Sequence, residues 1–322
     1  MKVSPTVVLH TDKPQAALKL VKERHPDLTF LTCNTYAELP SLVEKSPAEV
    51  IYSVRFAGTP EFPRQALLDS DTVKWIAVGG SGTDHLQPWN PDQLIVTNAA
   101  GVAADMMAEY VLGSLLNFRL GLRHFHKMQQ VKTWFAGSVT PIEGSTALIL
   151  GLGHTGCAVA RRFNSMGMHV VGTRARTTAT EFVDEVHPPE SLLDLLPRAD
   201  VIVCTVPLIK STRNLLSTEA FDCLKPGCVL IDVSRGGVVN EQALLSALES
   251  GKLHAAALDV FEQEPLPANH PFWNMDNVLL TPHCSSVYEG WELKSVELFS
   301  ANLSRYCEGR PLQNIVDPDR GY

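Results

Sequence analysis

Polar side chains that could carry out acid–base chemistry follow three apolar segments in the second half of the chain. Arg235, Glu264 and His283 each come shortly after such a segment. The carboxyl ends of parallel strands meet at one edge of a sheet, where ligands bind, so a cation, acids and a histidine gathered there predict a catalytic set. The alternatives are a solvated arginine at 235 and a turn glutamate before Pro265. There is no H-x-x-H pair or cysteine–histidine cluster, so no metal is predicted.

The segment "GLGHTG" joins an apolar segment to a helical pattern and is typical of a dinucleotide site. In this pattern Gly151 permits a tight turn, Gly153 lets the backbone approach a pyrophosphate, and Gly156 lets the helix pack on the strand. The free N–H groups at the start of the helix can donate hydrogen bonds to the phosphates. We expect His154, in the loop, and Thr155 to shape or contact this phosphate site. A glycine-rich turn without a ligand is the alternative.

The segment "VVGTRAR" lies where NAD enzymes place an acidic residue, about 20 residues beyond the glycine pattern. It offers Thr173, Arg174 and Arg176 and no acid. A carboxylate there would repel the extra phosphate of NADP, whereas arginine forks well onto phosphate oxygens. The segment therefore predicts NADP(H) in preference to NAD(H), with two ordinary surface arginines as the alternative. Three residues after the expected strand 200–204 are also assigned to the cofactor site: Val206, Pro207 and Thr212.

Apolar segments alternate with helical patterns along almost the whole chain, which predicts parallel sheets with right-handed crossovers. Strands are expected at 6–10, 28–33, 49–54, 73–78 and 94–99, and then at 146–150, 169–173, 200–204, 228–233, 255–260 and 277–281. Helices are expected at 14–25, 36–46, 63–70 and 104–127, from near Cys157, and at 287–309 with Gly309 as a C-terminal cap. The fold class is therefore α/β, with two doubly wound parallel sheets. The second sheet has the six strands of a dinucleotide-binding domain.

The composition is typical of a soluble globular protein of two domains. The 322 residues are 45% hydrophobic and 19% charged, and the net charge of -8 argues against a nucleic-acid partner. No apolar run is long enough to span a membrane. The N-terminus is interpreted as a first strand rather than a signal peptide. The seven scattered cysteines predict a reduced, cytoplasmic chain.

In this order and spacing, the motifs resemble those of the D-isomer-specific 2-hydroxyacid dehydrogenases. The resemblance covers essentially the whole chain and rests on "GGSGTDHL", "GLGHTG", "DVSRGGVVNEQALLSAL", "ALDVFEQEPLP" and "LTPHCSS". Within the family, the chain looks most like the bacterial type A glyoxylate/hydroxypyruvate reductases, and the closing "DPDRGY" adds to that similarity.

The resemblance implies a role for each candidate residue. Arg235 would bind a 2-oxo acid through its carbonyl oxygen and carboxylate. His283 would give a proton to the carbonyl oxygen as hydride arrives from the nicotinamide, and Glu264 would raise the histidine pKa and orient the ring. Asp259, assisted by the carbonyl of Val233, would hold the nicotinamide carboxamide.

The substrate carboxylate would bind to the backbone N–H groups of Ser81 and Gly82, which form an anion nest. Arg55, at the end of the expected strand 49–54, is a second candidate for the same carboxylate, with an exposed arginine as the equal alternative.

The resemblance also implies the domain organisation. Residues 1–103 and 284–322 would form a flavodoxin-like substrate domain, and residues 104–283 a Rossmann dinucleotide-binding domain, with the substrate in the cleft between them. The helix and arm over 104–140 would form a homodimer contact, with Trp134 reaching towards the partner's pocket. Packing of that helix in the core of its own domain is the alternative.

The expected activity is NADPH-dependent reduction of small 2-oxo acids, glyoxylate and hydroxypyruvate first. One alternative is NAD-dependent oxidation of a D-2-hydroxy acid such as D-lactate or D-3-phosphoglycerate, although the phosphoglycerate enzymes often carry regulatory domains for which 322 residues leave no room. A formate dehydrogenase is disfavoured because that branch has glutamine in place of Glu264. A nucleotide-sensing corepressor on the same fold is a third reading, and the lack of disordered interaction tails argues against it.

Overall fold

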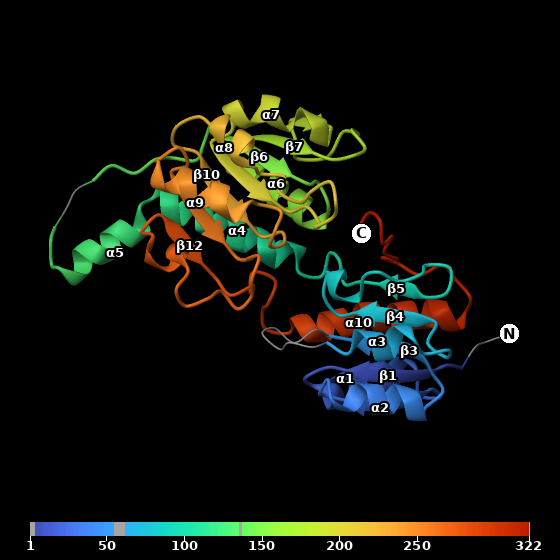
Figure 1. The fold of residues 1–322 in the computed structure, drawn as a ribbon. Helices are drawn as coiled ribbons and strands as arrows, with labels where there is room; N and C mark the ends of the chain where they lie inside the picture. Colours follow the sequence, from blue (N-terminus) through green and yellow to red (C-terminus); the bar gives the residue numbers. More distant parts are fainter. Residues whose placement is uncertain (1–3, 55–61, 135–136, 322) are drawn as a thin grey trace. The chain divides into compact units, whose positions relative to one another are not determined.

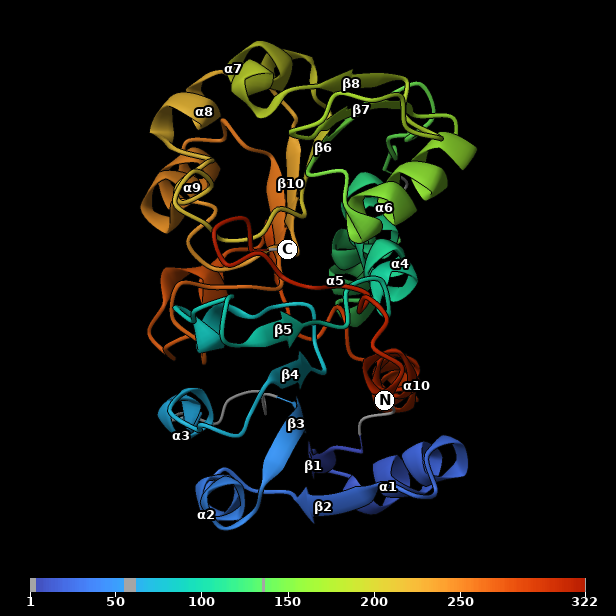
Figure 2. The same cartoon turned by 90° about the vertical axis from the view of Figure 1, so that its right-hand side faces the viewer.

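The computed structural model describes residues 4–54, 62–134 and 137–321, and the chain divides into two compact units (Figures 1 and 2). Unit 1 comprises Met1–Val102 and Tyr288–Tyr322, so the C-terminal segment returns to the N-terminal part of the chain. Unit 2 is the continuous segment Ala103–Val287. Among the described residues, no helix is long and apolar enough to cross a membrane.

Unit 1 is built on a five-stranded sheet in which all neighbouring strands are parallel. The strand order β2-β1-β3-β4-β5 is the flavodoxin-like order. The strands are β1 (Thr6–His10), β2 (Thr29–Cys33), β3 (Ala48–Ser53), β4 (Trp75–Val78) and β5 (Ile95–Thr97).

Successive side chains of these strands face opposite sides of the sheet, so both faces bury apolar clusters. Val7 packs with the helices of one side, and Val8 with those of the other side. Figure 2 shows α1 and α10 on one side, and α2 and α3 on the other. These helices are α1 (Pro14–Arg24), α2 (Glu38–Lys45), α3 (Arg64–Leu68) and α10 (Trp291–Cys307), and the short 3-10 helix η1 (Asp84–Leu86) follows β4.

Unit 2 is built on a seven-stranded parallel sheet of order β12-β11-β10-β9-β6-β7-β8. Numbered from β6 within the unit, this is the 3-2-1-4-5-6 order of a dinucleotide-binding sheet with one further strand. The strands are β6 (Thr146–Leu150), β7 (His169–Thr173), β8 (Glu185–His187), β9 (Val201–Cys204), β10 (Val229–Asp232), β11 (Ala255–Leu258) and β12 (Val278–Leu280). The predicted α/β class with two parallel sheets is confirmed.

Helices cover both faces of the second sheet, since the two buried clusters contain side chains from different helices. One face packs against α4 and α6, and the other against α7, α8 and α9. The helices of unit 2 are α4 (Ala104–Arg119), α5 (Leu122–Gln130), α6 (His154–Ser165), α7 (Leu192–Leu195), α8 (Thr218–Asp222) and α9 (Glu241–Glu249). The short 3-10 helices are η2 (Pro189–Ser191), η3 (Leu196–Arg198) and η4 (Pro271–Asn274).

Three expectations about these elements were wrong. The helix expected over 104–127 breaks at Gly121, whose φ of 61° is left-handed, and continues as α5. Helix α6 begins at His154 rather than near Cys157, so His154 and Thr155 lie in its first turn and not in a loop. Strand β8 was missed because its three residues include two polar side chains and are all half-buried, so they form no apolar run. Gly309, with φ of 65°, follows α10 as its expected cap.

Candidate active site

His283 and Glu264 form a hydrogen-bonded pair beyond the carboxyl ends of β12 and β11. The His283 Nδ1 atom lies 2.8 Å from Glu264 Oε2, and the two side chains are 34% and 32% exposed. A carboxylate can only accept, so Nδ1 carries the proton of this bond and Nε2 is left to exchange a proton with a ligand. The other oxygen, Oε1, accepts a hydrogen bond of 3.1 Å from the Phe261 N–H, which ties Glu264 to its own loop.

Arg235 lies on the loop after β10, which directly contacts the loop that carries Glu264. A Cβ atom at Gly236 would lie 1.9 Å from the carbonyl oxygen of Phe261, so only glycine allows the two backbones to approach this closely. Arg235 is half-buried, and its Nη1 atom donates to the carbonyl of Ser234 at 2.6 Å. Because β10, β11 and β12 are neighbours in the sheet, the three predicted residues lie on adjacent loops.

Asp259 holds the loop on which His283 lies. Its carboxylate is 0% exposed and accepts from the Thr281 hydroxyl at 2.6 Å and from the N–H groups of Cys284 and Ser285 at 2.9 and 3.0 Å. Thr281 donates its proton to Asp259, so the Tyr110 hydroxyl, 2.8 Å away, donates to Thr281.

The hydrogen-bond network around Asp259 was not predicted from the sequence. Burial raises the pKa of Tyr110 to about 12, which keeps that hydroxyl protonated. Tyr110 belongs to α4 and Thr281 follows β12, and no sequence spacing links residues so far apart. The structure shows Asp259 accepting hydrogen bonds from the loop that carries His283. Its predicted contact with the nicotinamide carboxamide stays a prediction.

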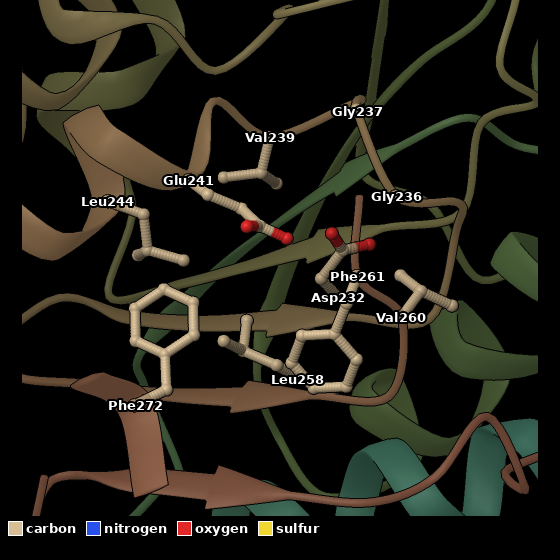
Figure 3. A pocket seen from close by; sticks show the side chains of 10 residues that line it. All are labelled: Asp232, Gly236, Gly237, Val239, Glu241, Leu244, Leu258, Val260, Phe261 and Phe272. Carbon is tan, nitrogen blue, oxygen red and sulfur yellow. The ribbon is translucent and has the colours of Figure 1, made fainter. Parts of the chain in front are cut away.

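Asp232 supports the turn before Arg235. Its Oδ1 atom accepts from the N–H and the hydroxyl of Ser234 at 2.9 and 2.5 Å, and burial raises the pKa of its carboxyl to about 7. Figure 3 shows this carboxyl beside Glu241 in a small cavity whose other side chains are mainly apolar. The cavity has a volume of about 10 Å³, which is about enough for one water molecule and too small for a 2-oxo acid.

The glycine turn after β6 has the close contacts that the sequence pattern requires. Gly151 has φ of 97°, and a Cβ atom at Gly156 would lie 2.0 Å from the carbonyl oxygen of Gly151. A Cβ atom at Gly153, the residue before α6, would have no other atom within 4 Å, so the backbone there is open to a ligand. Exposed backbone before a helix N-terminus fits a pyrophosphate.

Residues after β9 lie against this glycine turn. A Cβ atom at Gly151 would be 2.9 Å from Val206 Cγ1, and the hydroxyl of Thr205, which was not predicted, donates to the carbonyl of Gly151 at 2.7 Å. Thr212 donates to the carbonyl of Pro207 at 2.6 Å and so shapes the same segment.

The hydroxyl of Thr155 points to α4, where it lies 3.6 Å from the Met107 sulfur. Val233, the predicted neighbour of Asp259, is buried.

The end of β7 also meets the glycine turn and presents the two arginines. The carbonyl of Thr173 accepts from the N–H groups of Gly151 and Leu152 at 3.1 and 3.0 Å. Arg174 is half-buried, with Nη1 3.3 Å from the hydroxyl of Thr180, and Arg176 is exposed. The backbone that carries Arg174 thus leaves β7 next to the glycine turn, and the contact of both arginines with a cofactor phosphate stays a prediction.

The predicted carboxylate-binding residues belong to unit 1. Ser81 is exposed and Gly82 half-buried, both in the loop between β4 and η1. Arg55 lies outside the described residues.

A parallel sheet in the dinucleotide-binding order, its glycine turn and the histidine–glutamate pair at its carboxyl edge together define a dinucleotide-dependent oxidoreductase. The chain belongs to the D-isomer specific 2-hydroxyacid dehydrogenase family, because the model of that family's NAD-binding domain matches residues 112–285, over half of the chain. Its cofactor is accordingly a nicotinamide dinucleotide.

Known proteins similar to this chain include reductases and NADPH-bound structures. A glyoxylate reductase of Thermofilum pendens is 32% identical and aligns over 81% of this chain and 80% of its own length. A D-isomer specific 2-hydroxyacid dehydrogenase from Xanthobacter autotrophicus Py2, solved with NADPH and MES, is 32% identical with a TM-score of 0.86 over 99% of this chain and 100% of that chain. An NADPH-dependent glyoxylate/hydroxypyruvate reductase from Sinorhizobium meliloti, solved with NADP and sulfate, is 25% identical with a TM-score of 0.81 over the same shares.

One similar protein is longer than this chain and is named for an activity other than glyoxylate reduction. The D-3-phosphoglycerate dehydrogenase of Methanocaldococcus jannaschii is 28% identical over 98% of this chain, and the aligned region spans 59% of the length of that relative.

Proposed function

We propose that the protein reduces small 2-oxo acids, glyoxylate and hydroxypyruvate, to 2-hydroxy acids with NADPH. The observation that carries the proposal is the 2.8 Å pair of His283 Nδ1 and Glu264, which leaves the histidine Nε2 atom available to a ligand. The reductases among the similar proteins support the substrate class.

In the proposed reaction a bound nicotinamide cofactor would supply the hydride that the carbonyl carbon of the substrate accepts. His283 gives the proton from Nε2 to the carbonyl oxygen, and Glu264 stabilises the charged ring and fixes its orientation. Arg235 binds the carbonyl oxygen and the carboxylate through its planar guanidinium. The N–H groups of Ser81 and Gly82 bind the carboxylate, the role that the family resemblance implies for them.

The preference for NADPH rests on the end of β7. The carbonyl of Thr173 accepts hydrogen bonds from the glycine turn, and Arg174 and Arg176 follow it in the sequence without an intervening acid. A 2'-phosphate could accept hydrogen bonds from these arginines and would not be repelled by a carboxylate. The similar structures that hold NADPH or NADP support the same preference.

A homodimer is also part of the proposal. No residue of α5 is buried, and Figure 1 shows this helix extending away from the sheet of unit 2. Its polar side chains hold it in place, since Arg123 donates to the carbonyl of Val278, and Lys127 pairs with Asp276 at 2.6 Å. Apolar side chains of α5 and the arm after it remain exposed: Leu122, Val131, Trp134 (99% exposed) and Val139. A second copy of the chain would bury them, because exposed apolar patches mark interaction surfaces.

The proposal is tested by the absorbance of the reduced nicotinamide in purified protein. Glyoxylate, hydroxypyruvate, pyruvate and 3-phosphohydroxypyruvate would each be mixed with NADPH and with NADH. We expect the highest kcat/KM with NADPH and one of the first two acids. A clear preference for NADH and 3-phosphohydroxypyruvate would favour the phosphoglycerate activity of the longer relative. No turnover of any 2-oxo acid would contradict the enzyme function and favour a nucleotide-sensing protein.

A further inference from the structure

Three successive carbonyl groups in the loop after β4 are each held by a different donor. The carbonyl of Gly79 accepts from the Ser295 hydroxyl, that of Gly80 from the Ala99 N–H, and that of Ser81 from the Asn98 side-chain amide. Each of these three distances is 2.8 Å. Each of the three peptide groups in the loop 79–82 is therefore held by a hydrogen bond to its carbonyl oxygen.

The two side-chain donors are themselves held in place. Asn98 follows β5, is 7% exposed, and accepts with Oδ1 from the Ala100 N–H at 3.1 Å. Ser295, on α10, is buried and accepts from the Tyr52 hydroxyl of β3 at 3.0 Å. Because the second hydrogen bond of each side chain fixes its orientation, each presents a donor to the loop.

The hydrogen bonds that hold these three carbonyl groups also determine where the following N–H groups point. In a planar trans peptide the carbonyl of one residue and the N–H of the next point in opposite directions. Holding the carbonyls of Gly79, Gly80 and Ser81 therefore aims the next three N–H groups, up to that of Gly82, away from the donors. Among the described residues, none accepts a hydrogen bond from these three N–H groups. Successive backbone N–H groups without a partner in the protein can form a nest that binds anions.

We infer that Asn98 is a positioning residue for the substrate carboxylate. Its side-chain amide fixes the Ser81–Gly82 peptide, whose N–H is one of the two donors proposed for that carboxylate. Ser295 holds the Gly79–Gly80 peptide at the start of the same loop, whose N–H is not one of these two donors. This inference rests on the proposed function, because it requires a substrate with a carboxylate.

The test is the steady-state kinetics of Asn98→Ala with glyoxylate and NADPH. Without the amide, the Ser81–Gly82 peptide can rotate, and its N–H loses its aim at the carboxylate. We expect KM for glyoxylate to rise about 10- to 100-fold, the range for losing a hydrogen bond to a charged group, with a much smaller change in kcat. The dissociation constant of NADPH should stay within about twofold, since the glycine turn belongs to unit 2. Asn90→Ala is the matched control, because Asn90 is exposed and caps a separate turn through the Asp92 N–H.

The outcomes separate this inference from the proposed function. If the wild-type protein turns over no 2-oxo acid, the proposed function itself fails. If the wild-type protein is active and Asn98→Ala lowers the melting temperature without raising KM, Asn98 is only structural and the inference is wrong. Should Asn98→Ala not fold, Asn98→Asp carries the same expectation, because its carboxylate still accepts from the Ala100 N–H but cannot donate to the Ser81 carbonyl. An unchanged KM in that variant would equally overturn the inference.

Discussion

His283 is held in a conformation that a histidine rarely adopts. Its φ of 52° is left-handed, which costs on the order of 1 kcal/mol or more for a residue with a Cβ atom. The three hydrogen bonds that Asp259 accepts from the loop at Thr281–Ser285 offset this cost. The positions of His283 and Glu264 after apolar strands predicted both as site residues, and the family resemblance implied that they pair. The sequence could not predict the conformation of the loop, which depends on a buried carboxylate from another strand.

Arg174 is the residue whose replacement should change the cofactor preference. In Arg174→Asp a carboxylate replaces the cation beside the glycine turn, so it repels a 2'-phosphate and can accept from ribose hydroxyls instead. We expect the ratio of kcat/KM for NADPH over NADH to fall at least about 10-fold, measured with the same 2-oxo acid. Arg161→Asp, on the exposed side of α6 where Arg161 pairs with Asp105, makes the same charge change as a control. An unchanged ratio in Arg174→Asp would remove Arg174 from the cofactor site.

Most of the elements could be predicted from the sequence, because buried parallel strands produce apolar runs and the helices between them are amphipathic. Strand β8 could not, because a short, half-exposed edge strand buries too little surface to require such a run. The break between α4 and α5 depends on one glycine, Gly121, within a pattern that continues across it. The contact between the loops after β10 and β11 also depends on one glycine, Gly236. The motif predicted that Gly236 lies in a loop, but it did not predict that this loop contacts the backbone of Phe261.

Gly236→Ala should separate these two loops. The added methyl group would lie 1.9 Å from the Phe261 carbonyl oxygen, and a contact this close to backbone can be relieved only if a loop moves. We expect a loss of about 1–3 kcal/mol in the free energy of unfolding, measured by urea denaturation, and a fall in kcat/KM, because Arg235 is adjacent. Gly113→Ala is the control: apart from the adjoining backbone of its own helix, no atom lies within 4 Å of an added Cβ, so alanine should be neutral or slightly stabilising. Wild-type stability and activity in Gly236→Ala would contradict the close contact.

Each of the two units has a complete core and its own sheet, and each supplies one part of the proposed chemistry. Unit 2 carries the glycine turn and the His283–Glu264 pair, and unit 1 carries the 79–82 loop with its fixed carbonyls. The apolar surface of α5 and its arm is not used by either core. The proposed homodimer would bury this surface.

The homodimer can be tested by sedimentation equilibrium of the purified protein. We expect a mass of twice 35.3 kDa for the wild-type chain. Val131→Asp places a charge on the exposed arm and should shift the equilibrium towards 35.3 kDa, because burying an unpaired charge is costly. Leu193→Asp, at an exposed leucine of α7, should leave the mass unchanged. A wild-type mass of 35.3 kDa, or an unaffected Val131→Asp variant, would contradict this surface as the dimer contact.

The central claim is that His283 donates the proton in an NADPH-dependent reduction, and His283→Ala tests it most directly. The measurement is the rate of NADPH oxidation on addition of glyoxylate, alongside NADPH binding followed by fluorescence. We predict that kcat falls about 100- to 10,000-fold, the range for removing a general acid, while NADPH affinity changes only a few-fold. Turnover near the wild-type rate, or a collapse of NADPH affinity with turnover retained, would contradict the role assigned to His283.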